Sequence, residues 1–208
     1  SIWVTGVQTC ALPIDLVPDA DQFLIEARSV GLGGLLRNPQ TLDLIARAWS
    51  TTHRPRNKFE AYELGISELI KETNPGHVQR GRTYSTEDLN EAAGAIASML
   101  LLSDIDGVSR VDCTTVEGCA DISNVPYEDK PTVDATLKRR VFTSSREDYF
   151  ELVHRTIQEF LSARDLANRI THGMPISRVF ALLLGADGRP VSSIWRSEER
   201  RVGKECRS

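Results

Sequence analysis

Residues 150–163 read FELVHRTIQEFLSA, and this stretch decides the fold of the second half of the chain. The apolar side chains before His154 suit a short strand, and those after it recur at helical spacing. A second short apolar run, residues 141–142, lies upstream. Two strands are therefore predicted, at residues 141–142 and 149–153, on either side of the polar turn 143–148. The pattern therefore predicts a β-hairpin that leads directly into a helix.

The helix after the hairpin is predicted at residues 155–170. Its expected inward side chains are Ile157, Phe160, Leu161, Ala167 and Ile170. Two helices are predicted before the hairpin: one begins at Ser85, which with Asp88 resembles a capping box, and a short one occupies residues 130–137. Helices on both sides of a hairpin predict a winged-helix-like domain.

Three further helices are predicted in the first part of the chain. Asp19 can cap the first of them, and Gly31 can end it. Asn38 and Pro39 mark the next start, because Asn is favoured at the N-cap and Pro at the first helical position. The third helix covers residues 58–72, with an apolar stripe formed by Phe59, Tyr62, Ile66, Leu69 and Ile70.

These elements predict a mainly α protein built from consecutive domains. A small helical domain is expected at residues 15–82, followed by the winged-helix-like domain with its short β-hairpin at 83–172. A further helix at 176–184 and a polar turn after it predict the start of a C-terminal helical array at 173–195.

The two ends of the chain differ from the rest. Residues 4–14 read VTGVQTCALPI and residues 196–208 read RSEERRVGKECRS, and both resemble in-frame translations of common short-read sequencing adapters. Eight of the last thirteen residues are charged, so neither a helix nor a strand formed there could bury an apolar face. We therefore expect residues 1–14 and 196–208 to be adapter-derived; the alternative is a basic tail and a short N-terminal strand.

The composition of the segment between those ends excludes some classes of function. Without the tail the chain has 20 basic and 26 acidic residues, a formal net charge of −6. This acidity argues against nucleic-acid binding through a broad basic face. No apolar run approaches the roughly 20 residues that span a bilayer. Only Cys113 and Cys119 remain, which predicts a cytoplasmic protein without a disulfide framework.

Motifs for catalysis and metal binding are missing from the sequence. There is no G-x-x-x-x-G-K-[ST] phosphate loop, and no nucleophile, base and orienting acid can be paired by motif. Residues 100–106, LLLSDID, faintly resemble a strand ending in a magnesium ligand, but their apolar period belongs to a helix. Cys113 and Cys119 are spaced C-x5-C without a nearby histidine, which is weak for zinc. We expect no catalytic residue, no metal ligand and no enzyme activity in this segment.

Three residues remain as candidate binding residues. Pro39 lies in LLRNPQTL at 35–42, and from its position alone it is an N1 proline. His154 lies at a strand-to-helix junction, where a capping or core histidine is the ordinary interpretation. A helix N-terminus with His154 and Arg155 beside it can also hold phosphate, through amide N–H groups and positive charge.

The two motifs together resemble the region that follows the nucleotide-binding core of NACHT-family NTPases. These are signal-transduction ATPases of the STAND class, which include NLR receptors and many bacterial defence proteins. The family segments "LL-x-NP-x-TL" and "H-x-x-x-QEFL-A-A" match residues 35–42 and 154–163, in the same order and about 110 residues apart. Ser162 stands where the family more often has Ala. The resemblance covers most of residues 19–190 and favours a bacterial member.

The resemblance implies a role for each candidate residue. Pro39 would touch the adenine and His154 the β-phosphate of bound ADP, with Arg155 beside it, while Phe160 and Leu161 would pack the winged-helix core. The cofactor would be ADP or ATP, with Mg²⁺ in the parent protein, which would be the ATPase. The implied partners are an N-terminal P-loop domain of the same chain and, on activation, further copies of the parent.

A second function class remains open. The segment would then be a winged-helix or helical protein-interaction module without a nucleotide role. Nucleic-acid binding is a weaker form of this alternative, because the helix at 155–170 carries Glu159 and Asp165 among its arginines.

Overall fold

The computed structural model describes residues 17, 19–34, 36, 39–50, 54–71, 83–111, 118–184 and 188–189. Its contacts divide the chain into two compact units, residues 1–69 and 70–208, and each is described here by itself. Helix accounts for 62% of the described residues, and the mainly α fold class is confirmed.

The first unit is built from three helices: α1 (Ala20–Ser29), α2 (Pro39–Ser50) and α3 (Lys58–Lys71). The Asp19 carboxylate accepts a hydrogen bond of 2.9 Å from the Gln22 amide, which makes Asp19 the predicted N-cap. Gly31 has a positive φ of 83°, the backbone conformation that ends many helices at glycine. Pro39 is the first helical residue of α2, as predicted, and Asn38 lies outside the described residues.

The core of this unit is centred on an aromatic pair. Phe23 and Trp49 meet edge to face, with ring centroids 5.4 Å apart, and the Trp49 indole donates to Glu26. Around them lie Ala27, Leu32, Ile45, Ala46 and Ala61, all buried. A Cβ on Gly65 would lie 2.4 Å from the Leu44 carbonyl, so α2 and α3 can approach only because residue 65 is glycine.

One residue of the predicted stripe on α3 is not in this core. Tyr62, Ile66, Leu69 and Ile70 are buried as predicted, but Phe59 is 60% exposed. Phe59 lies in the first turn of α3, one turn before Tyr62, where the helix has only begun. The prediction that Phe59 faces the core was therefore wrong.

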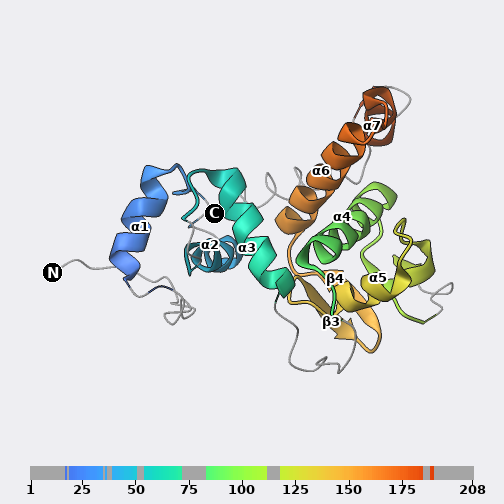
Figure 1. The fold of residues 1–208 in the computed structure, drawn as a ribbon, viewed down its shortest axis with the longest axis horizontal. Helices are drawn as coiled ribbons and strands as arrows, with labels where there is room; N and C mark the ends of the chain where they lie inside the picture. The colour runs from blue at the N-terminus through green and yellow to red at the C-terminus, as the bar shows by residue number, and fades with distance from the viewer. Residues whose placement is uncertain are drawn as a thin grey trace, which may run out of the picture. The chain divides into compact units, whose positions relative to one another are not determined.

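The second unit combines helices with a small sheet (Figure 1). Its helices are α4 (Thr86–Ser103), the 3-10 turn η4 (Ile122–Asn124), α5 (Lys130–Leu137), α6 (Arg155–Thr171) and α7 (Ile176–Leu183). Its strands are β1 (Gly107–Ser109), β2 (Cys119–Asp121), β3 (Phe142–Arg146) and β4 (Tyr149–Leu152). Ser85 caps α4 by accepting from the Asp88 amide at 3.0 Å, as predicted.

The sheet has the order β2-β1-β4-β3. β3 and β4 form the predicted hairpin, but its turn is confined to two residues, Glu147 and Asp148, so β3 is longer than expected. β1 pairs antiparallel with β4, with Val108 opposite Phe150. A hairpin that follows α5 and pairs with the short strand after α4 gives this unit its winged-helix-like arrangement. The sequence did not predict β2, which pairs parallel with β1.

Helix α6 packs on α4 through a face that differs from the predicted one. The buried residues of α6 are Ile157, Gln158, Leu161, Ser162 and Leu166. Phe160 and Ile170 are only partly buried, and Ala167 is exposed, so the prediction of Ala167 as an inward residue was wrong. The buried face includes Ser162, whose hydroxyl is satisfied inside the core by donating to the Gln158 carbonyl at 2.7 Å.

The last described helix, α7, exposes much of its surface. Ile176 and Phe180 are more than half exposed, whereas Val179 is buried. Among the described residues, no helix combines the length and apolar character needed to cross a bilayer. The predicted adapter-derived segments, 1–14 and 196–208, lie outside the described residues.

Candidate functional site

His154 occupies the junction between β4 and α6. It is the N-cap residue of α6, with an extended backbone (φ −157°, ψ 140°), and its carbonyl accepts from the amides of Ile157 and Gln158. The hydrogen bond from the Val153 amide to the Val141 carbonyl, 3.1 Å long, joins this junction to the residue before β3. The local fold therefore fixes the backbone of His154 from both sides.

The imidazole of His154 acts as the cap of α6. Its Nδ1 accepts a hydrogen bond of 3.1 Å from the Thr156 amide, so this nitrogen carries no proton. Burial lowers the pKa of His154, and the nearby Glu159 carboxylate opposes that shift only in part. The ring is therefore held neutral, with its proton on Nε2. Within the described residues, Nε2 has no hydrogen-bond partner.

The first turn of α6 differs from the expected phosphate cradle. The Thr156 amide is bound by the imidazole, and the Ile157 amide donates to the His154 carbonyl. These N–H groups are consequently not available to an anion in this arrangement. Among the described residues, the Nε2–H of His154 is a donor at the junction that has no partner.

Arg155 is the first residue of α6, directly beside His154, and is partly exposed. Its Nε donates to Glu159 at 3.3 Å, and one terminal nitrogen donates to the Gln158 side chain at 3.2 Å. Its guanidinium thus lies along the helix, toward the second turn. The structure brings Arg155 and His154 together, but with the arginine already engaged by its own helix.

Pro39 is exposed at the start of α2 in the first unit, whereas His154 belongs to the second. The structure describes each residue within its own unit.

The sequence segment that resembled a magnesium site is helical. Leu100 to Ser103 form the last turn of α4, and Asp104 caps it in a left-handed conformation with φ 54°. Among the described residues, no cluster of His, Cys, Asp and Glu suits a metal ion. Cys119 is disulfide-bonded, whereas the sequence predicted a protein without a disulfide framework, and Cys113 lies outside the described residues.

A cleft of about 320 Å³ lies between α4 and α6, away from His154. Asn90, Gly94, Tyr127, Arg164, Arg169 and His172 are among its lining residues. Its polar groups bond mainly to one another: Arg164 donates to both oxygens of Asn90 at 3.1 Å, and Arg169 pairs with Asp165 at 2.8 Å. The Arg164–Asn90 contacts join the two helices, whereas Arg169 and Asp165 both belong to α6.

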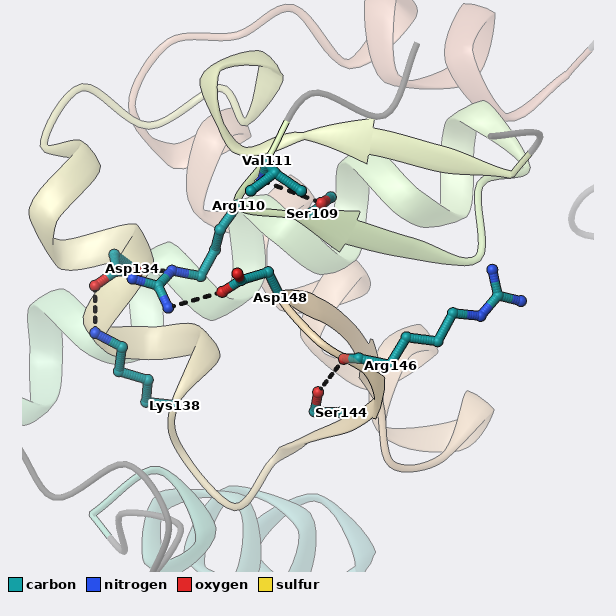
Figure 2. A network of polar contacts seen from close by, with 8 residues as sticks. All are labelled: Ser109, Arg110, Val111, Asp134, Lys138, Ser144, Arg146 and Asp148. Carbon is teal, nitrogen blue, oxygen red and sulfur yellow. Dashed lines mark hydrogen bonds and ion pairs between the residues drawn. The ribbon is translucent and has the colours of Figure 1, made fainter. Parts of the chain in front are cut away.

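A second polar cluster, which sequence reasoning missed, surrounds Arg110 (Figure 2). The Arg110 guanidinium pairs with Asp134 at 2.7 Å and with Asp148 at 3.0 Å. Asp134 in turn binds the buried ammonium of Lys138 at 2.5 Å. The partners lie 24 and 38 positions from Arg110 along the chain, so no local pattern could indicate them.

The chain was compared with known protein families, proteins and structures. The chain matches no protein-family model, no curated protein and no solved structure. The two sequence motifs and the geometry of the junction at His154 are therefore the features that bear on function.

Proposed function

We propose that this chain is a regulatory part of a NACHT-type signal-transduction NTPase. Its winged-helix unit would close over a nucleotide bound by a P-loop domain of the same protein. The observation that supports this most directly is the capped but half-satisfied imidazole of His154. In the motif at 154–163, the histidine is the residue that the resemblance assigns to phosphate.

The chemistry of the contact follows from the ring. A neutral imidazole with its proton on Nε2 donates one hydrogen bond, and a β-phosphate oxygen is a strong, charged acceptor. Because Nδ1 is fixed on the Thr156 amide, the ring cannot turn without breaking the cap of α6. The donor is therefore held in a fixed direction. The positive end of the α6 dipole adds a favourable field for an anion.

The proposed switch has two states. In the closed state ADP would be held between the P-loop domain and His154, with Pro39 against the adenine and Mg²⁺ held by the P-loop domain. Exchange for ATP would release the winged-helix unit and expose surfaces for oligomerisation. A ligand shifts such an equilibrium only through contacts that differ between the states, and the His154 contact is the proposed difference.

Two variants in the larger, P-loop-containing protein separate this role from simple helix capping. His154→Asn keeps an N-cap oxygen for the Thr156 amide but lacks a donor at the Nε2 position. His154→Ala loses both. Loss of a hydrogen bond to a charged group corresponds to about a ten- to hundredfold faster ADP release in both variants. If only the Ala variant changes, and only in thermal stability, His154 is a structural cap and the proposal is wrong.

A protein-interaction module without a nucleotide role is the second candidate. The exposed Ile176 and Phe180 of α7 favour it, because large apolar side chains grouped on a short helix often mark contact sites. If both His154 variants retain ADP as well as the wild-type protein does, the protein-interaction module is the candidate that remains.

The nucleic-acid form of the alternative loses support. With β3 and β4 as the wing, the recognition helix would be α5, the helix before the hairpin, and not the helix at 155–170 that the sequence suggested. In α5 the ammonium of Lys130 donates to the Val125 carbonyl. Lys138, directly after α5, is buried against Asp134. Neither cation is presented as a phosphate contact would require.

A further inference from the structure

The β3–β4 turn is held by contacts that do not belong to the hairpin. Arg110, the residue after β1, donates from its amide to the Asp148 carbonyl at 2.9 Å and from its guanidinium to the Asp148 carboxylate at 3.0 Å. The same guanidinium reaches Asp134 of α5 at 2.7 Å. One arginine thus joins the wing turn, the edge of β1 and α5.

Asp148 is the residue of the turn that needs such support. Its φ of 56° places it in the left-handed region, which Asp and Asn enter more readily than other side chains but which still costs free energy. Beyond the turn, the strand register shifts between Ser144 and Arg146, and the Ser144 hydroxyl donates to the Arg146 carbonyl. The tip of the hairpin therefore has few regular ladder hydrogen bonds of its own.

The far end of the charge chain is anchored in the core. Lys138 has only 5% of its side chain exposed, and its ammonium binds the second oxygen of Asp134. This pair connects Asp134 to the buried Lys138 without involving the wing turn. The charges alternate in sign along the series Asp148, Arg110, Asp134 and Lys138. The side chains in the two ion pairs of Arg110 are about one-third exposed.

We infer that these four residues form a latch, in which Arg110 keeps the wing turn docked and its loss releases the turn with the adjoining part of β3, while β1 stays paired with β4. Arg146 lies next to the turn, at the end of β3, but is not one of the four latch residues. Its side chain points away from the network in Figure 2 and lies over the Tyr149 ring, 5.6 Å from the centroid. The wing is thus a two-state element, docked or released, and its docking is electrostatic.

The inference predicts which part of the molecule opens. Amides of residues 143–149 exchange faster when the latch is broken, whereas those of β1 and α6 keep their protection. Exposed ion pairs are screened by salt, so protection of the turn in the unmodified protein also falls as ionic strength rises. The junction at His154 is held by β1, β4 and the Val153–Val141 hydrogen bond, and it stays in place.

Hydrogen exchange on the full 208-residue chain tests the latch with three variants. Arg110→Gln removes the charge, and Asp148→Asn removes the carboxylate while tolerating the left-handed backbone. Arg146→Gln is the matched control, an arginine at the end of β3, next to the turn, whose side chain lies over Tyr149 and not in the Arg110 cluster. We expect about three- to tenfold faster exchange at residues 143–149 in the first two variants and no change in the control.

Two results would overturn the latch. Exchange at 143–149 that is unchanged in Asp148→Asn shows that the turn holds itself. An equal increase in Arg146→Gln shows that any loss of charge loosens the turn. If Arg110→Gln fails to fold, Asp148→Asn with its salt dependence decides alone, because that variant leaves Arg110 paired with Asp134.

Discussion

The two ends of strand β4 meet polar groups in opposite ways. At the turn end the Asp148 carboxylate and carbonyl are both bound by Arg110, which is itself bound by Asp134. At the other end the His154 ring uses Nδ1 to cap α6, and Nε2 has no partner among the described residues. A closed network fixes structure, whereas a donor that is fixed in direction but unused is available to a ligand. The contrast supports a stabilising role for the turn end and is consistent with the proposed binding role of the His154 end.

The largest effect is expected at the buried end of the charge network. Asp134→Asn leaves the Lys138 ammonium, only 5% exposed, without its carboxylate partner. Removing one partner of a buried pair costs about 3 kcal/mol of unfolding free energy, at the lower end because Asp134 is partly exposed. Urea unfolding measures the loss. The double variant Asp134→Asn/Lys138→Met should recover most of it, and no recovery would place the cost elsewhere.

A substitution between the two ends should have a somewhat smaller effect. A Cβ on Gly107 would lie 2.7 Å from the Phe150 carbonyl and 2.6 Å from the Tyr149 ring, so Gly107→Ala must push β1 from β4. We expect about 1–3 kcal/mol of destabilisation, measured by thermal unfolding. Gly94→Ala is the control, because its Cβ would meet the Asp165 Cβ at 3.1 Å and the Leu161 carbonyl at 3.6 Å, both longer than the contacts at Gly107. Equal losses in both variants would contradict this description of the sheet.

The helix positions were predictable from the sequence because their signals are local. Asp19 and Ser85 cap the helices that follow them, and Pro39 begins α2. The buried face of α6 was not predictable from hydrophobic spacing, since Ser162 and Gln158 are buried although both are polar.

The candidate site was predictable only in part. The position of His154 between strand and helix follows from its neighbours in sequence, but the choice between its two ring nitrogens depends on a three-dimensional hydrogen bond. Strand β2 has only three residues and no alternation long enough to detect. The Arg110 network joins residues far apart in the chain, which no periodicity marks.

The smallest stability effect is expected from the titration of His154. Burial lowers its pKa below the ordinary value of 6.5, so the folded state favours the neutral ring. The resulting stabilisation is complete above pH 6.5 and is lost as the pH falls through the folded-state pKa. The melting temperature between pH 7.5 and pH 5 should therefore depend less on pH in His154→Asn than in the unmodified protein. Measurements about 0.1 pH units apart would resolve the difference in slope. An identical pH profile for both proteins would mean that the ring is not held neutral.

The most direct test of the binding role is the nitrogen NMR spectrum of the His154 ring in the larger, P-loop-containing protein. Without nucleotide, the account predicts a neutral ring with the proton on Nε2 and a bare Nδ1 that accepts from Thr156. Addition of ADP should shift the Nε2 and Nε2–H signals strongly and leave Nδ1 as an acceptor. A ring that is protonated on Nδ1, or an Nε2 signal that ADP leaves unchanged in a protein shown to have bound it, would contradict the proposed phosphate contact.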